Sequence, residues 1–133
     1  MKKNVLVTGG NGQLAQCIKL VAKSHQAFNV VVLDKTELDV TCPISISKVF
    51  NTNNWHYCIN TAAFTNVENA EHNTETAYLV NTEGAANLAE ACKKADVVLI
   101  QISTDYVFDG NKQKPYLETD PVKPLNKYGE SKL

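Results

Sequence analysis

One stretch near the N-terminus decides the fold: Thr8-Gly9-Gly10-Asn11-Gly12-Gln13-Leu14-Ala15. It follows an apolar run, Val5-Leu6-Val7, and opens an amphipathic segment that continues to Ala22, which is the pattern of a strand, a tight turn and a helix start. Gly9 and Gly12 stand three apart, as needed where φ is positive or where backbone approaches a pyrophosphate closely. The following helix directs its free N–H groups at such a phosphate. The stretch therefore predicts a dinucleotide-binding turn.

An acidic residue at the end of the next apolar run supports this interpretation over an ordinary strand-to-helix turn. Asp34 closes Val30-Val31-Val32-Leu33, about 20 residues after the turn, where dinucleotide-binding folds place a carboxylate on the adenosine ribose. Lys35 beside it is suited to attract a 2′-phosphate. We therefore expect the chain to bind NADH or NADPH.

Composition narrows the class of protein. The chain has 133 residues and a net charge of −1, which suits one domain and offers no broad basic surface for nucleic acid. No apolar run approaches the ~20 residues of a membrane span, so we expect neither nucleic-acid nor membrane partners, and a cytoplasmic location. Cys17, Cys42, Cys58 and Cys92 lack C-x-x-C spacing, which favours buried free thiols over disulfides and predicts no metal site.

Strand and helix signals alternate along the chain. The expected strands are Asn4–Thr8, Val30–Asp34, Leu38–Val40, Tyr57–Asn60 and Val97–Ile102. The expected helices are Gly12–Ser24, one that begins at Pro43, Thr74–Lys94 and one that begins at Lys127. This alternation predicts an α/β fold, a Rossmann-type doubly wound parallel sheet with helices on both faces. Right-handed crossovers give the strand order 3-2-1-4-5, with the fifth strand at an edge and the ligand at the carboxyl ends of the strands.

Two further features suggest carbonyl reduction. Tyr128 and Lys132 are four residues apart, on one helix face. An ammonium about 4 Å from a phenol contributes about 4 kcal/mol at an effective dielectric near 20, before desolvation losses, and so lowers the phenol pKa. Such a phenol can give a proton to a carbonyl oxygen as hydride reaches its carbon. Thr104, after the fifth strand, is placed to bind the same oxygen. The simpler alternatives are a surface pair and a strand-end cap.

Taken together, these motifs resemble the extended short-chain dehydrogenase/reductases. The resemblance covers the whole chain and rests on the glycine turn, Asn60-Thr61-Ala62-Ala63, the run from Ser103 to Gly110, and Tyr-x-x-x-Lys. Further matches lie in Leu38–Thr41, Ala62–Glu68 and Pro124–Gly129. They resemble the subgroup that reduces the 4-keto group of a dTDP-linked 4-keto-6-deoxyhexose with NADPH or NADH, in dTDP-L-rhamnose formation.

The resemblance implies roles for individual residues. The residues that it implies contact the cofactor are Gly9, Gly12, Gln13, Leu14, Asp39, Val40, Ala62, Ala63, Tyr128 and Lys132. The catalytic residues are Thr104, Tyr128 and Lys132, with Lys132 on the nicotinamide ribose. The sugar pocket is lined by Thr65, Val67, Glu68, Thr104, Asp105 and Tyr106.

Two residues depart from the family pattern, and two other functions stay open. Ala15 stands where the family usually has glycine, and Glu68 where many members have aspartate. Asp105 after the strand-end threonine also suits a sugar-nucleotide epimerase or dehydratase. A non-catalytic regulatory subunit that binds dinucleotide is the alternative outside enzymes, although Thr104, Tyr128 and Lys132 argue against it.

Family members continue well past the Tyr-x-x-x-Lys helix. The resemblance therefore implies that residues 1–133 are an incomplete NAD(P)-binding domain, without the C-terminal substrate domain, of a protein that can form homodimers. The last helix is short, and its final turn leaves four carbonyls without partners. We expect Tyr128 and Lys132 to be mobile or misplaced, and residues 1–133 by themselves to show no measurable reductase activity.

Overall fold

A four-stranded parallel sheet forms the centre of the fold, which a computed structural model describes for all residues 1–133. The strands are β1 (Lys3–Thr8), β2 (Phe28–Val32), β3 (Tyr57–Asn60) and β4 (Val98–Gln101). Their order is β2-β1-β3-β4, and every neighbouring pair is parallel. The expected α/β fold with a parallel sheet is confirmed, including the position of the last strand at an edge.

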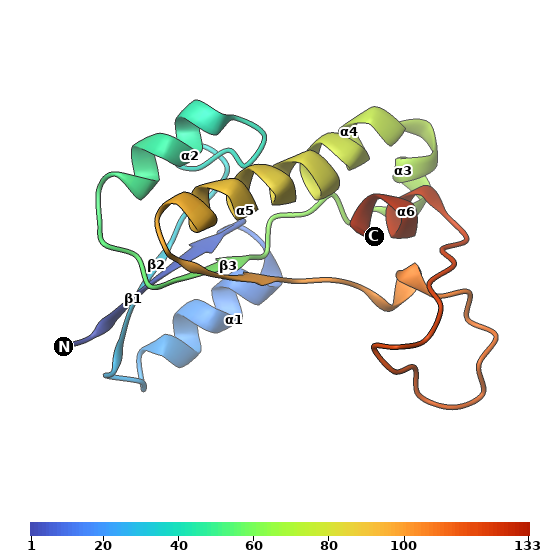
Figure 1. Cartoon of the computed structure of the whole chain (residues 1–133), viewed down its shortest axis with the longest axis horizontal. Coiled ribbons are helices and arrows are strands. Elements are labelled where there is room, and N and C mark those ends of the chain that lie inside the picture. The colour runs from blue at the N-terminus through green and yellow to red at the C-terminus, as the bar shows by residue number, and fades with distance from the viewer.

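Helices cover both faces of this sheet. Helix α1 (Gln13–Ala22) lies on one face, and α2 (Pro43–Phe50) and α5 (Gly84–Lys94) lie on the other (Figure 1). A second, helical part of the molecule lies beyond the carboxyl ends of the strands. It contains α3 (Val67–His72), α4 (Thr74–Tyr78), α6 (Lys127–Lys132) and the 3₁₀ turn η2 (Asp105–Val107). The π-helical turn η1 (Leu79–Glu83) joins α4 to α5, so one long helix runs through both parts (Figure 1).

The strand expected at Leu38–Val40 does not form, so the predicted order 3-2-1-4-5 is wrong in its first position. The backbone of this segment bonds locally, because the Leu38 N–H donates to the Asp34 carbonyl and the Cys42 N–H to the Asp39 carbonyl. Leu38 and Val40 are nevertheless buried. Their alternating apolar pattern reflects turns packed against the core and not a fifth strand. The other four expected strands keep their predicted order.

Helix α3 was not predicted, and its start depends on a polar cap. The Asn66 side chain accepts a hydrogen bond from the Asn69 N–H at 2.8 Å, which satisfies one of the free donors of the first turn. The segment carries no helical repeat of large apolar residues, and Ala70 is its only buried residue. Short polar helices of this kind depend on capping and tertiary contact, which periodicity does not detect.

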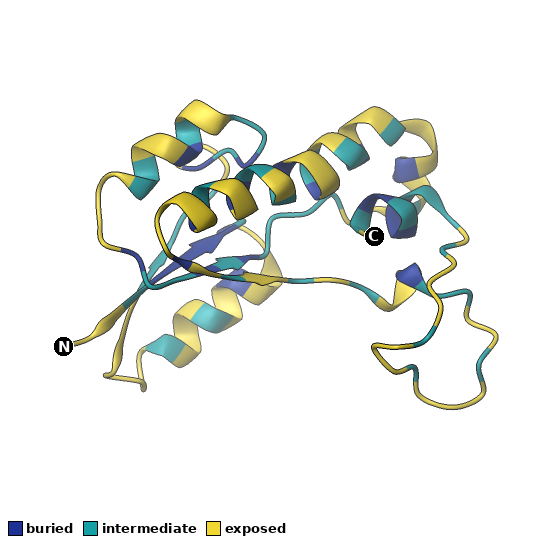
Figure 2. Cartoon of the chain, in the orientation of Figure 1, coloured by how far each residue is buried: buried dark blue, intermediate teal, exposed yellow.

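The main core lies between the sheet and the α2–α5 face (Figure 2). Leu6, Ile46 and Leu88 are at most 2 % exposed there, and Trp55 donates its indole N–H to the Val49 carbonyl. Each fully buried leucine or isoleucine stabilises the fold by roughly 1.5–3 kcal/mol. Glycine suits the position of Gly84, because a Cβ would come within 2.8 Å of the Val40 side chain.

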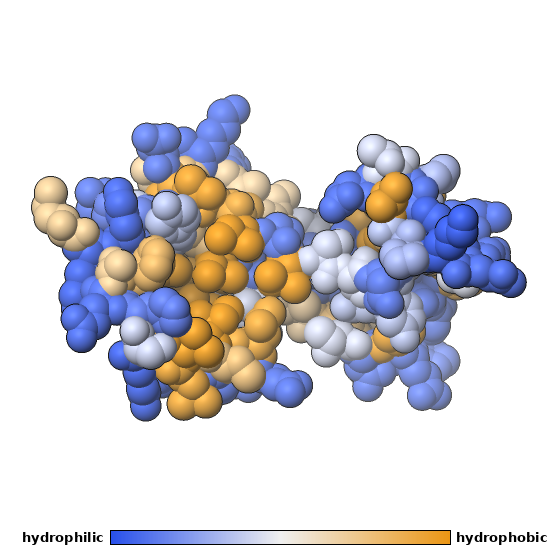
Figure 3. All heavy atoms as spheres, turned by 90° about the horizontal axis from the view of Figure 1, so that it is seen from below, coloured by the Kyte–Doolittle hydropathy of each residue, from blue (hydrophilic) through white to orange (hydrophobic).

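The opposite face of the sheet is less completely covered. Its small core joins Val5, Val7 and Ala15 beneath α1, while Val98 and Ile100 on the edge strand β4 stay exposed. Seen from below, hydrophobic side chains gather on the part of the molecule that holds the sheet (Figure 3). No helix of the structure combines the length and apolar character that crossing a membrane requires.

The four cysteines are free thiols, but their environments differ. Cys58 and Cys92 are buried in the main core, as expected. Cys17 is exposed and Cys42 is half-buried, so the expectation of buried thiols was wrong for these two. Cys17 lies on the outward side of α1, where the amphipathic pattern places solvent-facing residues.

The last helix is capped and packed against its neighbours, so the expectation that Tyr128 and Lys132 would be misplaced is wrong. The Asn126 side chain caps α6 by accepting from the Gly129 N–H at 2.7 Å. Tyr128 is 9 % exposed and packs with Ala70 and Ala77. Tertiary contacts thus compensate for the shortness of the helix. Gly129 permits this packing, because a Cβ there would overlap the Tyr106 carbonyl oxygen of η2.

We predict that Gly129→Ala loosens α6 even though alanine favours a helix by about 1 kcal/mol over glycine. The added Cβ meets backbone at Tyr106, which cannot move away as a side chain can. Hydrogen exchange of the α6 amides is expected to accelerate at least tenfold. Gly84→Ala is the matched control, because its Cβ meets the Val40 side chain and touches neither η2 nor α6, so exchange in α6 should stay unchanged. Equal exchange in Gly129→Ala and the unmodified chain would contradict this account of the packing.

Candidate functional site

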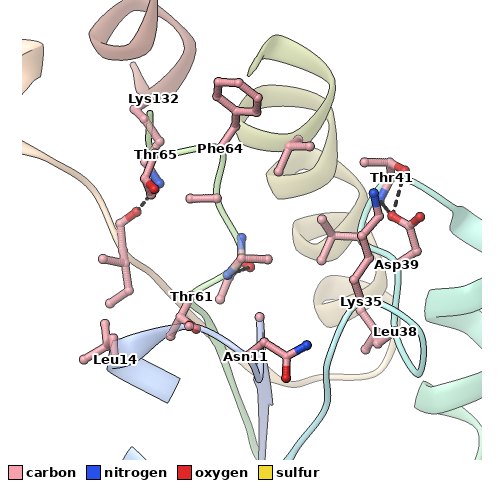
Figure 4. Close-up of a pocket in the computed structure, with 18 of the residues that line it drawn as sticks. Asn11, Leu14, Lys35, Leu38, Asp39, Thr41, Thr61, Phe64, Thr65 and Lys132 are labelled. Carbon is pink, nitrogen blue, oxygen red and sulfur yellow. Dashed lines mark hydrogen bonds between the residues drawn. The ribbon is translucent and has the colours of Figure 1, made fainter. Parts of the chain in front are cut away.

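A cleft of about 680 Å³ opens at the carboxyl ends of the strands, between the sheet and the helical part of the molecule (Figure 4). Most of the residues that the sequence assigned to a cofactor line it. These are Gly9, Gly12, Gln13, Leu14, Asp39, Val40, Ala62, Ala63, Tyr128 and Lys132. Of the residues assigned to the sugar pocket, Thr65 lines it as well.

Buried polar side chains tie the strand ends together beneath the cleft. The Thr8 hydroxyl donates to Asn60 Oδ1 at 2.6 Å, and the Thr61 hydroxyl donates to the Thr8 carbonyl at 2.6 Å. Asn60 also accepts from the Ala62 N–H at 3.2 Å and donates to Gln101 Oε1 at 2.8 Å. These bonds fix the ends of β1, β3 and β4 relative to one another, and with them the floor of the cleft.

The glycine turn fits against this floor because two of its three glycines, Gly9 and Gly10, lie where the neighbouring backbone leaves no room for a side chain. Gly9 has φ of +69°, and a Cβ there would lie 2.7 Å from the Ala62 nitrogen. A Cβ on Gly10 would lie 2.8 Å from the Leu33 carbonyl carbon. The Gly10 N–H donates to the Leu33 carbonyl oxygen at 2.8 Å. The turn is therefore held between the ends of β2 and β3, and only glycine fits at both positions.

The N-terminus of α1 presents free donors to the cleft. Gly12 is the N-cap, and no side chain caps the helix, so the first N–H groups lack partners on their own helix. Gln13 and Leu14 line the cleft at this point, and the first turn carries no acidic residue. The helix is close to the sheet because Ala15 is fully buried. This arrangement fits a pyrophosphate.

Lys35, Asp39 and Thr41 line a different part of the cleft (Figure 4). Asp39 Oδ1 accepts from the Thr41 hydroxyl at 2.7 Å and from the Thr41 N–H at 2.9 Å. The Thr41 side chain and backbone bonds, followed by the charge of Lys35, hold the pKa of Asp39 below its ordinary value. Asp39 therefore organises its own turn, while the Lys35 side chain is exposed beside the cleft.

Asp34 does not line the cleft. Its Oδ1 accepts from the Thr36 hydroxyl at 2.6 Å, from the Thr36 N–H at 2.8 Å and from the Glu37 N–H at 3.3 Å. These bonds, that of the Thr36 side chain first, lower the pKa of Asp34. Only Oδ2 faces the glycine turn, where the Asn11 amide lies 3.5 Å away. The ribose role of Asp34 stays a prediction, and Lys35, unlike Asp34, lines the cleft.

Helix α6 brings Tyr128 and Lys132 to the cleft together. The ring of Tyr106 packs edge-on against that of Tyr128, with 5.6 Å between centroids and 71° between planes. The Lys132 ammonium donates to the Ile102 carbonyl, just after β4, at 2.6 Å. Burial lowers the pKa of Lys132. The last helix is thereby tied to the strand end that faces the cleft.

Several residues assigned to the sugar pocket lie outside the cleft lining: Val67, Glu68, Thr104, Asp105 and Tyr106. The Thr104 hydroxyl caps η2, since it accepts from the Tyr106 N–H at 3.2 Å and donates to Asp105 Oδ1 at 3.3 Å. This is the strand-end cap that the sequence analysis kept as the simpler alternative for Thr104. The catalytic role of Thr104 stays a prediction.

Some lining residues were missed by sequence reasoning. They are Asn11, Leu38, Thr41, Asn60, Thr61, Phe64, Thr76, Val80, Ile102 and Ser103. Thr76 and Val80 are four residues apart and so share a helix face. This spacing is the only feature of the sequence that could have suggested that both line the cleft. Spacing alone does not reveal whether such a face meets a core or a ligand.

The fold and the cleft define a dinucleotide-binding α/β domain with a tyrosine–lysine pair at its site. The chain belongs to the family described as the RmlD substrate binding domain, which matches residues 1–133. The dTDP-4-dehydrorhamnose reductase of Burkholderia thailandensis is 40% identical over 129 residues, which are 97% of this chain and 43% of that protein. That of Aggregatibacter actinomycetemcomitans is 38% identical over 128 residues, 96% of this chain and 44% of that protein.

Solved structures agree with this assignment. The dTDP-4-dehydrorhamnose reductase of Bacillus anthracis, in complex with NADP, is 36% identical with a TM-score of 0.95, over 99% of this chain and 47% of that one. The dTDP-4-dehydrorhamnose reductase of Clostridium acetobutylicum is 39% identical with a TM-score of 0.92, and the match covers 97% of this chain and 46% of that one. The chain thus spans less than half the length of the relatives it matches.

We predict that Gly12→Val weakens dinucleotide binding while the fold survives. A Cβ at Gly12 meets only the Gly9 oxygen, at 3.1 Å, which a shift of a few tenths of an ångström relieves, but the isopropyl group occupies the expected phosphate position. Calorimetry is expected to show at least a tenfold loss of NADPH affinity with an unchanged circular dichroism spectrum. Gly9→Ala, which clashes with Ala62 backbone, should instead lower the melting temperature. Unchanged affinity in Gly12→Val would remove the turn from the cofactor site.

Proposed function

We propose that this chain is the cofactor-binding portion of an NAD(P)H-dependent reductase. The enzyme transfers hydride to the 4-keto group of dTDP-4-dehydro-L-rhamnose, in dTDP-L-rhamnose biosynthesis in the cytoplasm. One observation carries the proposal: a single cleft is lined by both the glycine turn and the Tyr128–Lys132 pair. The NADP complex of the similar Bacillus anthracis reductase supports it.

The cofactor is NADPH or NADH, and it supplies the hydride when bound. The free N–H groups at Gln13 and Leu14, which follow the Gly12 N-cap, hold the pyrophosphate. Ala62 and Ala63 leave room along the cleft wall for the body of the dinucleotide. At the adenosine end, the exposed Lys35 ammonium attracts a 2′-phosphate, and Asp39 and Val40 lie beside the adenine.

Tyr128 gives the proton that reduction of a ketone requires. Its side chain is largely removed from water, and it shares the cleft with Lys132. The Lys132 ammonium, held by the Ile102 carbonyl, stabilises the phenolate that remains after transfer. It also binds the nicotinamide ribose. Thr104 is the second donor to the keto oxygen, which requires its hydroxyl to leave the η2 cap.

The sugar nucleotide lies against the helical part of the molecule. We assign its recognition to Thr65, Val67, Glu68, Asp105 and Tyr106. Of these, Thr65 lines the cleft, and Tyr106 contacts the Tyr128 ring, so that substrate contacts lie next to the proton donor. We further propose that the whole protein can form homodimers.

The turnover test uses a chimaera. Residues 1–133 are joined to the C-terminal portion of the Bacillus anthracis reductase that this chain does not cover. The chimaera is expected to oxidise NADPH only when dTDP-4-dehydro-L-rhamnose is present. A folded chimaera that binds NADPH but does not turn over this sugar would overturn the proposal.

We predict that Tyr128→Phe in the chimaera lowers kcat by roughly 10²–10⁴, the usual contribution of general acid catalysis. NADPH affinity should change less than threefold, because Lys132 is retained. Steady-state kinetics and fluorescence titration measure the two quantities. Tyr116→Phe is the matched control, because the Tyr116 hydroxyl bonds Asp109 in a loop outside the cleft. Wild-type turnover in Tyr128→Phe would remove this residue from the mechanism.

Lys35 is predicted to set the cofactor preference. Lys35→Ala should weaken NADPH binding about tenfold and leave NADH binding within twofold, because only NADPH carries the 2′-phosphate. Asp34→Ala provides the second arm: a carboxylate at the ribose would favour NADH. Calorimetry with residues 1–133 gives both affinity ratios. If neither substitution moves the ratio, the adenosine end of the cleft has been placed incorrectly.

A further inference from the structure

The glycine turn is bonded from outside the cleft by a side chain that the proposed function does not use. Gln16, near the start of α1, extends back along the chain, and its amide Nε2 donates to the Gly10 carbonyl oxygen. Neither Gly10 nor Gln16 lines the cleft, whereas Asn11 does (Figure 4). The Gly10 carbonyl is therefore bonded on the side of the turn that faces away from the cleft.

This bond fixes the peptide unit that joins Gly10 to Asn11. The C=O and N–H of a planar trans peptide point in opposite directions, and the chain has no cis peptide bond. Because Gln16 binds the Gly10 oxygen behind the turn, the Asn11 N–H points toward the cleft that Asn11 lines. The Gly12 N–H donates to the Gly9 carbonyl at 2.8 Å, but the Asn11 N–H has no acceptor in the protein. The turn thus offers the cleft a free donor that precedes those of α1.

Glycine makes this peptide unit easy to rotate. The Leu33 backbone leaves no room for a Cβ at Gly10, so the position has the wide conformational range of glycine. The bond from the Gly10 N–H to the Leu33 carbonyl fixes the peptide unit before Gly10 but not the one after it. Rotation of that second unit would turn the Gly10 oxygen into the cleft, where its partial negative charge repels a phosphate. The Gln16 amide opposes this rotation.

We propose that Gln16 is a positioning residue for the glycine turn: it holds the Gly10 carbonyl outside the cleft, so that the Asn11 N–H binds a phosphate group of the dinucleotide. The proposal rests on the dinucleotide binding proposed above. NADPH carries a pyrophosphate and a 2′-phosphate, and both present the same kind of acceptor oxygen. The Gln16 side chain is exposed, so packing of the core does not account for an amide at this position.

The first test uses Gln16→Met in residues 1–133 and compares ligands with and without phosphate. Methionine keeps the length and the helix propensity of glutamine but has no donor. NMR titration is expected to show a roughly three- to tenfold loss of affinity for ADP or for adenosine 2′-monophosphate, as loss of one ordinary hydrogen bond gives. Adenosine affinity should change less than about twofold, because adenosine carries no phosphate. Gln26→Met, in the exposed loop before β2, is the matched control and should leave all three affinities unchanged.

The ligand that loses affinity identifies the phosphate. A loss for ADP alone assigns the Asn11 N–H to the pyrophosphate, and a loss for adenosine 2′-monophosphate alone assigns it to the 2′-phosphate. Unchanged affinity for both ligands would overturn the proposal, and so would an equal loss for adenosine, which indicates a general loosening of the site. If Gln16→Met does not fold, Gln16→Ala provides the same test, since alanine is the best helix former.

The second test needs no ligand and reads the peptide unit directly. The Gly10 carbonyl carbon and the Asn11 amide nitrogen have NMR shifts that depend on the hydrogen bond and orientation of this unit. Gln16→Met is expected to move both resonances, while the Gly12 amide stays protected from exchange by the Gly9 oxygen. Resonances that stay in place would overturn the proposal. If the unmodified chain binds neither NADPH nor ADP, the proposed function fails, and the NMR shifts still decide whether Gln16 orients the turn.

Discussion

The structure depends on one junction of buried polar groups at the strand ends. Thr8 and Asn60 are at most 1 % exposed, and buried polar groups are costly unless they are bonded. Each is satisfied only when β1 and β3 end side by side, with Thr61 turned back onto the Thr8 carbonyl. Gly9 then follows at a distance from Ala62 that no side chain permits. The floor of the cleft and the phosphate turn are thus consequences of the same constraint.

The two ends of the cleft are built on different parts of the molecule, and the long helix connects them. Asn87, in the α5 portion, donates to the carbonyl of Val40, a lining residue of the cleft, at 3.2 Å. Asn81, in η1, reaches the other end at Phe64 and Ser131. One long helix therefore bonds the segment at Val40 on one side of the cleft and both Phe64 and α6 on the other.

Several polar side chains near the cleft form hydrogen bonds with the local backbone. Asp34 and Asp39 each accept from the hydroxyl and the N–H two residues further on, and Thr104 caps η2. Aspartate and threonine at strand ends commonly bond local N–H groups in this way. The same residue types are also expected of ligand contacts, so sequence cannot separate the two uses. Lys35, which has no such local bond, faces the cleft.

The sequence by itself determined the parallel α/β fold, four of its strands in order, and the glycine turn before α1, because apolar runs and glycine spacing are local signals. It also placed Tyr128 and Lys132 on one helix face. Only the tertiary structure decided that Leu38–Val40 forms turns, that the short helix α6 packs against α3 and α4, and that Asn81 bonds Phe64 and Ser131. These outcomes depend on which partner each backbone or buried polar group finds across the fold, and a linear pattern does not record that partner.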